Sequence, residues 1–268
     1  MHGMHARLPK HFVLEERLER YADAIELVPT HFAGCWRDAT TPLGARAFRG
    51  LKLDLGCGKG SFLVESARRE PETLFIGLDA EPVCIAYAAQ RVCEAELANA
   101  LLVPGRGDDV HRFFGAHELD GITINFPTPF PRKKEAGKRL VALERLIEYR
   151  RVLSQEGRVV FKTDHAPLFS FARTQFELAG YEICLETDDY RTLFPRTPAS
   201  EYEERLGSMG AKVFALEARV AELAGEPRQT ASLSLVDYLP DDLHSLAYIP
   251  HGMQGTVVNL RNRRDKRR

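Results

Sequence analysis

The residue types best suited to chemistry lie in one segment, residues 125–134, with the sequence NFPTPFPRKK. It begins with an amide directly after an apolar run, contains three prolines, and ends in a basic cluster. Loops at the carboxyl ends of strands carry the ligand site in open α/β sheets. A stiff loop with amide, aromatic and cationic groups suits a flat, hydrogen-bonding ligand attached to phosphates. The segment therefore predicts contact with a nucleobase in a nucleic acid.

A second candidate site combines a glycine loop with acidic residues. Gly56, Gly58 and Gly60 lie between a predicted strand and a predicted helix, where they allow a tight turn and a close approach of a ligand to the backbone. The spacing is GxGxG and not the dinucleotide pattern GxGxxG. Asp79 ends the next predicted strand, where it can accept hydrogen bonds from both ribose hydroxyls of an adenosine, and Asp108 follows the third strand, where it can accept from the adenine amine. Together these three strand ends predict S-adenosylmethionine as the cofactor.

Each acidic residue also has a plainer interpretation. Asp79 stands where a side chain caps the following helix, and Asp108 or Asp109 stands where a side chain caps the short helix around His111. Asp54, inside the first predicted strand, is a candidate for holding either the glycine loop or the ammonium group of the methionine moiety. Asn125, at the end of the fourth predicted strand, is placed among the cofactor contacts as well.

The predicted positions of these residues at strand ends depend on a regular alternation of strands and helices along the chain. Apolar runs and amphipathic stretches follow one another in an order that predicts a parallel sheet with helices on both faces. The predicted strands are 51–55, 73–79, 100–103, 120–125, 157–163, 181–185 and 211–220, and the predicted helices are 14–27, 61–69, 82–97, 111–114, 137–153 and 167–178. We therefore predict an α/β, Rossmann-like, seven-stranded and mostly parallel sheet.

The chain divides into three parts. Residues 1–50 are predicted to be an N-terminal helical segment, residues 51–220 the main domain, and residues 221–268 a C-terminal extension with a basic tail. Within the extension, residues 255–260 are predicted to form a strand.

Composition and charge restrict the class of protein. The net charge is −1, yet residues 132–151 and 261–268 each carry a net charge of about +5, which predicts a basic face on an acidic body. The terminal run can equally be a solvated tail. Five scattered cysteines without a CxxC pair predict reduced thiols in the cytoplasm. Neither a membrane span nor a metal site is predicted, and both a monomer and a homodimer remain open.

Four segments together resemble the tRNA (guanine-N7-)-methyltransferase family of class I methyltransferases. They are residues 53–60 (LDLGCGKG), 75–79 (FIGLD), 125–134 with the following 138–140 (KRL), and 163–164 (TD) paired with 200–205 (SEYEER) and Gly210. The resemblance covers about residues 51–220. It implies the class I methyltransferase fold, S-adenosylmethionine as the cofactor, tRNA as the partner, and methylation of N7 of a guanine, which is variable-loop guanine 46 in this family.

The resemblance also assigns roles to individual residues. The implied catalytic residues are Thr128, Asp164 and Glu203, of which the two carboxylates accept hydrogen bonds from N1–H and the amine of guanine, with Ser200 in support. Phe130 is a candidate for stacking on a base, or for packing under the loop. The implied phosphate contacts, which can also be a solvated helix start, are Arg132, Lys133, Lys134, Lys138 and Arg139.

The chain departs from the family pattern at the loop itself. Thr128 stands where the family has an aspartate, Glu135 where it has a histidine, and Ser200 where it has a threonine. Thr128 offers a hydroxyl without a carboxylate charge, which weakens guanine binding unless Glu135 or Asp188 substitutes. Three hypotheses follow: guanine-N7 methylation of tRNA, a relative that binds tRNA and cofactor without turnover, and methylation of another substrate.

Overall fold

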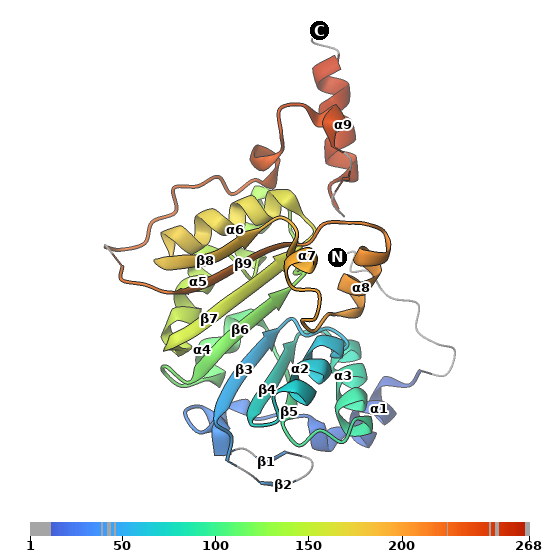
Figure 1. Ribbon diagram of the computed structural model, residues 1–268, viewed down its shortest axis with the longest axis vertical. Coiled ribbons are helices and arrows are strands. Elements are labelled where there is room, and N and C mark those ends of the chain that lie inside the picture. Colours follow the sequence, from blue (N-terminus) through green and yellow to red (C-terminus); the bar gives the residue numbers. More distant parts are fainter. Residues whose placement is uncertain are drawn as a thin grey trace.

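A seven-stranded sheet forms the centre of the computed structural model, which describes residues 12–38, 40–41, 44–45, 47–223, 225–246, 248–249 and 252–265. The strand order is β5-β4-β3-β6-β7-β9-β8 (Figure 1). The first five strands of this order, β5, β4, β3, β6 and β7, run parallel. Strand β9 is antiparallel to both of its neighbours, β7 and β8. The strands are β3 Gly50–Leu55, β4 Thr73–Asp79, β5 Ala100–Pro104, β6 Leu119–Asn125, β7 Leu153–Thr163, β8 Tyr181–Thr187 and β9 Phe214–Val220. The predicted Rossmann-like, mostly parallel sheet is confirmed.

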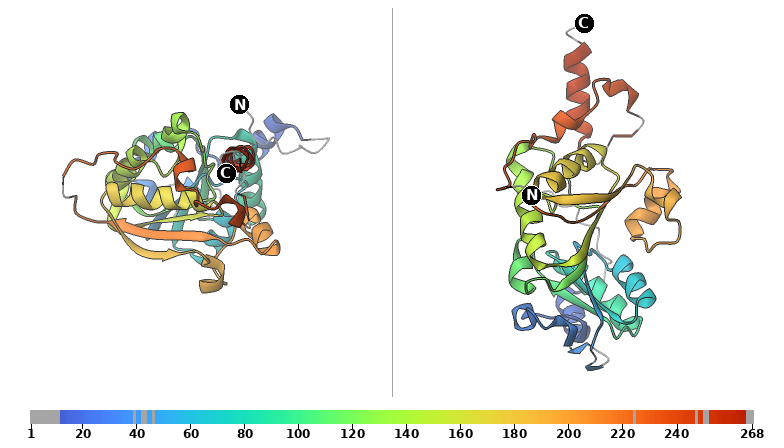
Figure 2. Two further views of the ribbon diagram at one scale, coloured as in Figure 1. Left: turned by 90° about the horizontal axis from the view of Figure 1, so that it is seen from above. Right: turned by 60° about the vertical axis from the view of Figure 1, so that its left-hand side comes forward.

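Helices cover both faces of this sheet (Figures 1 and 2). The α-helices are α1 Leu14–Arg20, α2 Ser61–Arg69, α3 Pro82–Glu94, α4 Val110–Phe113, α5 Leu143–Val152, α6 Ala166–Leu178, α7 Tyr190–Leu193, α8 Glu201–Ser208 and α9 Gln254–Asp265. Short 3₁₀ helices connect them: η1 Ala22–Ala24, η2 Pro29–Phe32, η3 Trp36–Asp38, η4 Gly107–Asp109, η5 Lys133–Lys138, η6 Leu235–Tyr238 and η7 Leu243–Ser245. A separate two-stranded ribbon joins β1 Thr40–Thr41 and β2 Gly44–Ala45.

The alternation of side chains along each strand divides the core into two apolar clusters. In β4, Leu74, Ile76 and Leu78 belong to the cluster under α4, α5 and α6, whereas Phe75 belongs to the cluster under α2 and α3. Successive side chains of a strand point to opposite faces, so a strand covered on both faces needs apolar residues at nearly every position. Burial on both faces therefore explains why the strands appear in the sequence as short runs of consecutive apolar residues.

The helices differ from prediction in three places. Residues 137–153 are not one helix, because η5 ends at Lys138 and α5 begins only at Leu143. Residues 14–27 form α1 followed by η1. Helices α7 and α8, between β8 and β9, were not predicted.

The strand predicted over residues 255–260 is wrong, because this segment lies in α9. Met253 and Val257 are fully buried and four residues apart, which is the spacing of one helical face. Figures 1 and 2 show α9 standing away from the sheet, so no strand edge is beside it to pair with. The apolar run in the sequence was too short to distinguish the periodicity of a strand from that of a helix.

The C-terminal extension first crosses α6 and then leaves the body of the molecule (Figure 2). Leu235 of η6 is buried, and the ring of Tyr238 packs edge-on against Phe171 of α6. Residues 266–268 of the basic tail lie outside the described residues. Among the helices of the described ranges, none has the length and apolarity that crossing a membrane requires.

Candidate functional site

The glycine loop joins the end of β3 to α2. Gly56, Gly58 and Gly60 have φ angles of 79°, 55° and 79°, a left-handed backbone that favours glycine. A Cβ on Gly60 would lie 2.8 Å from the Cβ of Ala88 in α3, so this position also permits the close packing of two helices. The N–H of Gly58 donates to Oδ2 of Asp79 at 2.9 Å, which ties the loop to the end of β4.

Asp79 lies at the second predicted strand end and faces a cavity of about 360 Å³. Its Oδ1 accepts from the N–H of Glu81 at 2.9 Å, so each oxygen holds one backbone donor and keeps a lone pair for another. Burial raises the pKa of this carboxyl. Asp108 and Asn125 line the same cavity, and Asp108 pairs with Arg145 at 2.8 Å. The structure thus brings together residues that the sequence placed at three strand ends.

Asp54 and the side-chain atoms of Asn125 are enclosed polar groups. Asp54 is 2% exposed, and neither its two oxygens nor the side-chain atoms of Asn125 have a partner of good hydrogen-bond geometry among the described residues. Burial raises the pKa of Asp54 to about 7, whereas the nearby Lys162 cation opposes the shift and the Asn125 amide is close enough to lower this pKa as well. Leaving such groups unpaired is unfavourable unless a ligand completes them. A ligand with both an ammonium group and hydrogen-bonding donors fits this pair, which agrees with the predicted S-adenosylmethionine.

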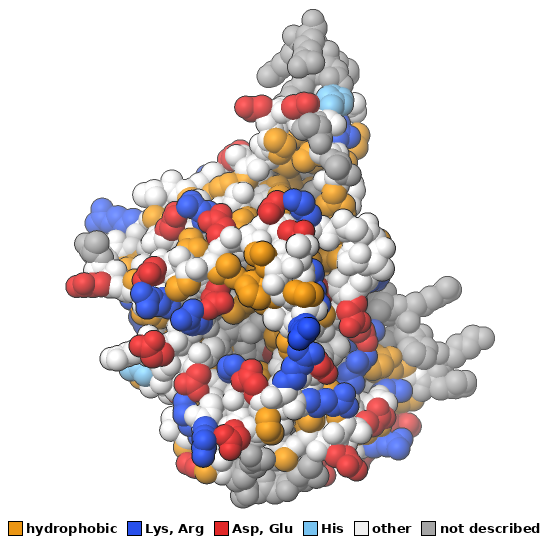
Figure 3. Space-filling model, in the orientation of Figure 1, with side chains coloured by type: hydrophobic (Ala, Val, Ile, Leu, Met, Phe, Trp, Pro, Cys, Tyr) orange, Lys and Arg blue, Asp and Glu red, His pale blue; other side chains and the backbone are white. Residues whose placement is uncertain are grey.

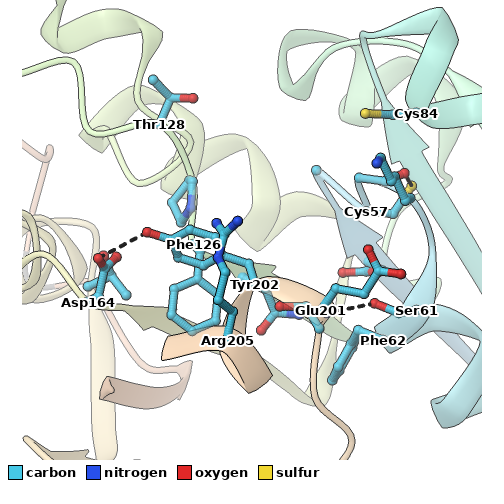
Figure 4. A pocket seen from close by; sticks show the side chains of 18 of the residues that line it. Cys57, Ser61, Phe62, Cys84, Phe126, Thr128, Asp164, Glu201, Tyr202 and Arg205 are labelled. Atoms are coloured by element: carbon cyan, nitrogen blue, oxygen red, sulfur yellow. Dashed lines mark hydrogen bonds between the residues drawn. The ribbon is translucent and has the colours of Figure 1, made fainter. Parts of the chain in front are cut away.

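A larger cavity of about 600 Å³ adjoins the first, and Asp54 and Asn125 line it. Figure 4 shows Asp164 on one side of it and Cys57 and Cys84 on the other, with Tyr202 and Arg205 of α8 between them. Both cavities are lined by a shared set of residues: Gly56, Asn125, Phe126, Pro127 and Thr128. The loop after β6 therefore stands at the junction of the two cavities.

This loop has a strained backbone that is held by a buried arginine. Phe126 and Phe130 have φ angles of 49° and 43°, which are rare for large side chains. Arg139 is 1% exposed, and its guanidinium donates to the carbonyls of Pro129, Phe130 and, in the C-terminal extension, Leu233 at 2.7–3.0 Å. Backbone strain persists where the surroundings enforce it and clusters at functional sites. Arg139 thus holds the loop in place, and the expected contact with phosphate is wrong for this buried side chain.

The other cations of the basic cluster are exposed. Arg132, Lys133, Lys134 and Lys138 lie on or beside η5. Lys138 lines the smaller cavity, as Phe130 does, and its Nζ is 5.8 Å from the centre of the Phe130 ring. On the face drawn in Figure 3, basic and acidic side chains are interspersed over the body of the molecule. Attraction of an anion to this face therefore depends on local clusters of cations.

Glu135 and Asp188, which could have replaced the carboxylate that is missing at Thr128, lie away from both cavities. Thr128 is exposed and lines both cavities. Glu135 pairs with Arg132 at 3.1 Å, and Asp188 pairs with Lys212 at 2.5 Å. Neither carboxylate lines either cavity, so neither replaces a loop aspartate in this structure.

Asp164 and Glu203 were expected to act together on a guanine, but the orientation of helix α8 directs the Glu203 carboxylate elsewhere. Oγ of Ser200 caps the helix by accepting from the N–H of Glu203 at 3.1 Å, and Ser200 lines the larger cavity. The Glu203 carboxylate points into the protein, where it pairs with Lys162 at 2.6 Å and Arg191 at 3.3 Å. Burial lowers the pKa of Lys162, and Glu203 raises it. Asp164 is thus the acceptor that reaches the cavity, while the structure does not bring Glu203 to it.

Sequence reasoning missed several residues that line the larger cavity, among them Lys59, His165, Tyr202 and Arg205. Nδ1 of His165 accepts from the N–H of Leu168 at 3.0 Å, so the proton of the neutral ring is on Nε2, which has no partner among the described residues. Burial lowers the pKa of His165 to about 4 and keeps the ring neutral. The pattern S-x-x-E at residues 200–203 was the available signal for α8, because it is typical of a helix start.

No group of three or more histidine, cysteine or acidic residues suited to a metal ion occurs within the described ranges. The polar side chains that line the two cavities are the groups that a ligand would meet there.

Comparison with known proteins identifies the family. A family model described as "Putative methyltransferase" matches residues 49–216. The "tRNA (guanine-N(7)-)-methyltransferase" of Clostridium kluyveri is 32% identical over 193 residues, which cover 72% of this chain and 89% of that protein. The protein with the same description from Geobacillus thermodenitrificans is 30% identical, with coverage of 63% of this chain and 79% of that protein.

A solved structure supports the fold alone. It is a 16S rRNA methyltransferase with 16% sequence identity and a TM-score of 0.52, matched over 65% of this chain and 89% of that one. The residues matched by the family model include strands β3 to β8, the glycine loop and the proline loop described above. This chain therefore belongs to the tRNA (guanine-N(7)-)-methyltransferase family.

Proposed function

We propose that this protein transfers a methyl group from S-adenosylmethionine to N7 of a guanine in tRNA. The observation that carries the proposal is the larger cavity, which has the unpartnered Asp54 and Asn125 as one part of its lining and Asp164 as another. Such a cavity accommodates a charged donor molecule and a hydrogen-bonding base side by side. Relatives named for this reaction support the choice of substrate, and the family resemblance indicates guanine 46 of the variable loop.

The residues divide the work between binding and orientation. Asp79 would accept from the ribose hydroxyls, Asp108 from the adenine amine, and Asp54 and Asn125 would hold the amino-acid end of the cofactor. When bound, S-adenosylmethionine supplies an electrophilic methyl group on its sulfonium sulfur. Because guanine N7 carries a lone pair outside the aromatic sextet, no side chain has to remove a proton first, and the protein acts mainly by positioning.

Asp164 is the residue that we assign to the guanine. Its carboxylate is a charge-assisted acceptor for N1–H or for the exocyclic amine. Thr128 contributes a hydroxyl at the rim, and Ser200 supports α8. Glu203 then acts through the position of α8, since its carboxylate is buried in ion pairs.

The exposed cations Arg132, Lys133, Lys134 and Lys138 would contact the tRNA phosphates, which give affinity without reading sequence. Phe130 beside Lys138 offers a ring to a base at the rim of the smaller cavity.

The test is methyl transfer to unmodified tRNA, followed by mass spectrometry of the nucleosides. We expect 7-methylguanosine from wild-type protein, no product from a transcript whose guanine 46 is replaced by adenine, and no product from one carrying 7-deazaguanosine, which lacks N7. Binding of S-adenosylhomocysteine, measured by calorimetry, is the control for a folded cofactor site. Cofactor binding without 7-methylguanosine in any tRNA would refute the proposal.

A second candidate function rests on a specific observation. Thr128 lacks the carboxylate of the family, and Glu203 is directed away from the cavity, so Asp164 is the one of the three implied catalytic residues that offers a carboxylate to a guanine there. A methyltransferase that acts on another substrate would show this reduced set of acceptors. Transfer of a tritiated methyl group to RNA, protein or small-molecule fractions, with no 7-methylguanosine, would favour it.

A further inference from the structure

The Asp164 carboxylate is held by two tyrosines from distant parts of the chain. Tyr202 of α8 donates its hydroxyl to Oδ2 of Asp164 at 3.1 Å, and Tyr248 of the C-terminal extension donates to the same oxygen at 2.7 Å. Asp164 follows β7 directly and is 9% exposed. An element outside the segment matched by the family model thus contacts the central acceptor of the candidate site.

The two oxygens of this carboxylate are in different situations. Oδ2 receives both phenol groups, whereas Oδ1 accepts no hydrogen bond from the described residues and is not among the fully enclosed, unpartnered atoms. Because Asp164 lines the larger cavity, one oxygen is anchored and the other is available to a ligand. A carboxylate anchored in this way presents an acceptor at a fixed place, which is what a positioning site requires.

Both tyrosines are suited to act as permanent donors. Burial and the adjacent Asp164 raise the pKa of Tyr202 to about 12, and the same causes raise the pKa of Tyr248, so both hydroxyls keep their protons at neutral pH. The Tyr202 ring is also packed against Phe126 of the proline loop, with centroids 5.2 Å apart. Tyr248 is 42% exposed, and its hydroxyl at 2.7 Å is the shorter of the two contacts.

We propose that Tyr248 is a positioning residue, through which the C-terminal extension fixes Asp164 with Oδ1 directed at the substrate base. The proposal rests on the function proposed above and adds the extension to the site. An aspartate carboxyl rotates easily about its last torsion angle, so two donors on one oxygen restrict it more than one does. The opposite role would be inhibition. If the Tyr248 hydroxyl occupied the position of a guanine N–H donor, it would compete with the substrate for the Asp164 carboxylate.

The variant Tyr248→Phe tests this role, because it keeps the ring and removes the hydroxyl. We expect kcat/KM for tRNA to fall about tenfold, as for the loss of one hydrogen bond to a charged group, while the Kd for S-adenosylhomocysteine stays within about twofold. Tyr238→Phe is the matched control, since the Tyr238 hydroxyl donates to the Ser232 carbonyl at 2.9 Å in the same extension. That control should keep its activity within about twofold.

A crystal structure of the Tyr248→Phe variant separates this proposal from the choice of substrate. We expect Asp164 to adopt one side-chain position in the wild type and a rotated or divided one in the variant, whatever nucleic acid is methylated. An unmoved Asp164, or methylation by the variant that equals or exceeds that of the wild type, would overturn the role of Tyr248. Absence of 7-methylguanosine from the wild-type reaction would instead overturn the proposed function.

Discussion

Asp54 illustrates how a single buried residue links stability to ligand binding. Its carboxylate is enclosed without a hydrogen-bond partner, and burial raises its pKa to about 7. Folding therefore favours the protonated form. Relative to the unfolded chain, this group stabilises the fold at low pH, and that contribution is lost as the pH rises through the folded-state pKa.

We predict that Asp54→Asn separates the two properties. The amide cannot ionise, so at pH 8 the ligand-free variant should be more stable than the wild type. Each kcal/mol gained in the free energy of unfolding should raise the Tm by about 2–4 °C. Below about pH 4 the difference should vanish, since both side chains are then neutral. Affinity for S-adenosylhomocysteine should fall at least tenfold, because the ammonium group loses a charged partner. Thermal unfolding with and without ligand measures both effects, and a variant that is less stable than wild type at pH 8 would contradict the account.

A pH dependence of binding follows from the same residue. The ionised form of Asp54 is the one that holds an ammonium group, so affinity for S-adenosylhomocysteine should decrease as the pH falls below about 7. Calorimetric titration between pH 5.5 and 8 measures this, with Asp54→Asn as the control that should show a flatter profile. Equal slopes for the two proteins would exclude Asp54 as the titrating group.

Thr128 allows a gain of function to be predicted. It is exposed at the junction of the cavities, so a substitution there should not disturb folding. Thr128→Asp supplies a charged acceptor for the guanine, and we expect kcat/KM for tRNA to rise about tenfold, or about 1.4 kcal/mol. Thr128→Asn has the same size without the charge and should give no such rise. A decrease in the aspartate variant would indicate that the threonine suits a different substrate.

The positions of the candidate cofactor residues were predictable because residue type and strand end together define where they lie. Asp54, Asp79, Asp108 and Asn125 all line the two observed cavities. Arg139 was not predictable in this way, since nothing in its charge distinguishes an exposed phosphate contact from a buried donor to three carbonyls.

At the scale of elements, the position of α8 depends on a buried ion pair at the end of β7. Lys162 and Glu203 are 2.6 Å apart and almost fully enclosed, and Oγ of Ser61 accepts from the N–H of Glu201 at 3.0 Å. These contacts connect α8 to the sheet and to the start of α2. Tyr202, which holds Asp164, depends on that placement.

We predict that Lys162→Met alone lowers the free energy of unfolding by about 3 kcal/mol, because it leaves a buried carboxylate with a weaker partner. The double variant Lys162→Met/Glu203→Leu should recover most of the loss, since well-packed apolar residues often replace a buried ion pair without penalty. Urea unfolding of Lys162→Met, of Glu203→Leu and of the double variant measures the coupling between the two residues. If the losses were simply additive, the pair would not be the link between α8 and β7.

The elements themselves were predicted unequally. The strands of the parallel part are runs of apolar residues that only a doubly covered sheet can bury, so their limits were close to those observed, except that β7 begins at Leu153 and not at residue 157. Residues 255–260 lack that constraint, because the burial of Met253 and Val257 by neighbouring parts of the extension decides their helical state. Helix α8 was missed although its capping residues were read as a family motif.

At the scale of the whole molecule, the basic C-terminal run offers a second contact for an anionic partner. Arg261 is committed to the fold, because its guanidinium donates to the Leu243 carbonyl at 2.6 and 3.1 Å. Arg263 and Arg264 follow on the same helix, α9, which leaves the body of the molecule (Figure 1). We predict that the cations of residues 263–268 contact the tRNA backbone.

Replacing the five basic residues 263, 264 and 266–268 by glutamine tests this without removing Arg261. Affinity for tRNA should fall about equally for all tRNAs, and the slope of log K against log salt should become less steep by about one for each phosphate that the variant no longer binds. The Tm and the Kd for S-adenosylhomocysteine should not change. An unaltered salt slope would show that the run is a solvated tail.

The sequence by itself determined the class of fold and the strand ends that form the candidate cofactor site. The reason is that burial on both faces of a sheet and a left-handed glycine backbone both depend on residues that are close together in the chain. It also determined the family, through the order of its four segments. The tertiary structure decided which of the charged residues face the cavity. Glu203 and Arg139 are turned inward by partners far away in the chain, and Tyr248 reaches Asp164 from 84 residues away. Such pairings depend on how distant elements meet, and local sequence patterns contain no information about that.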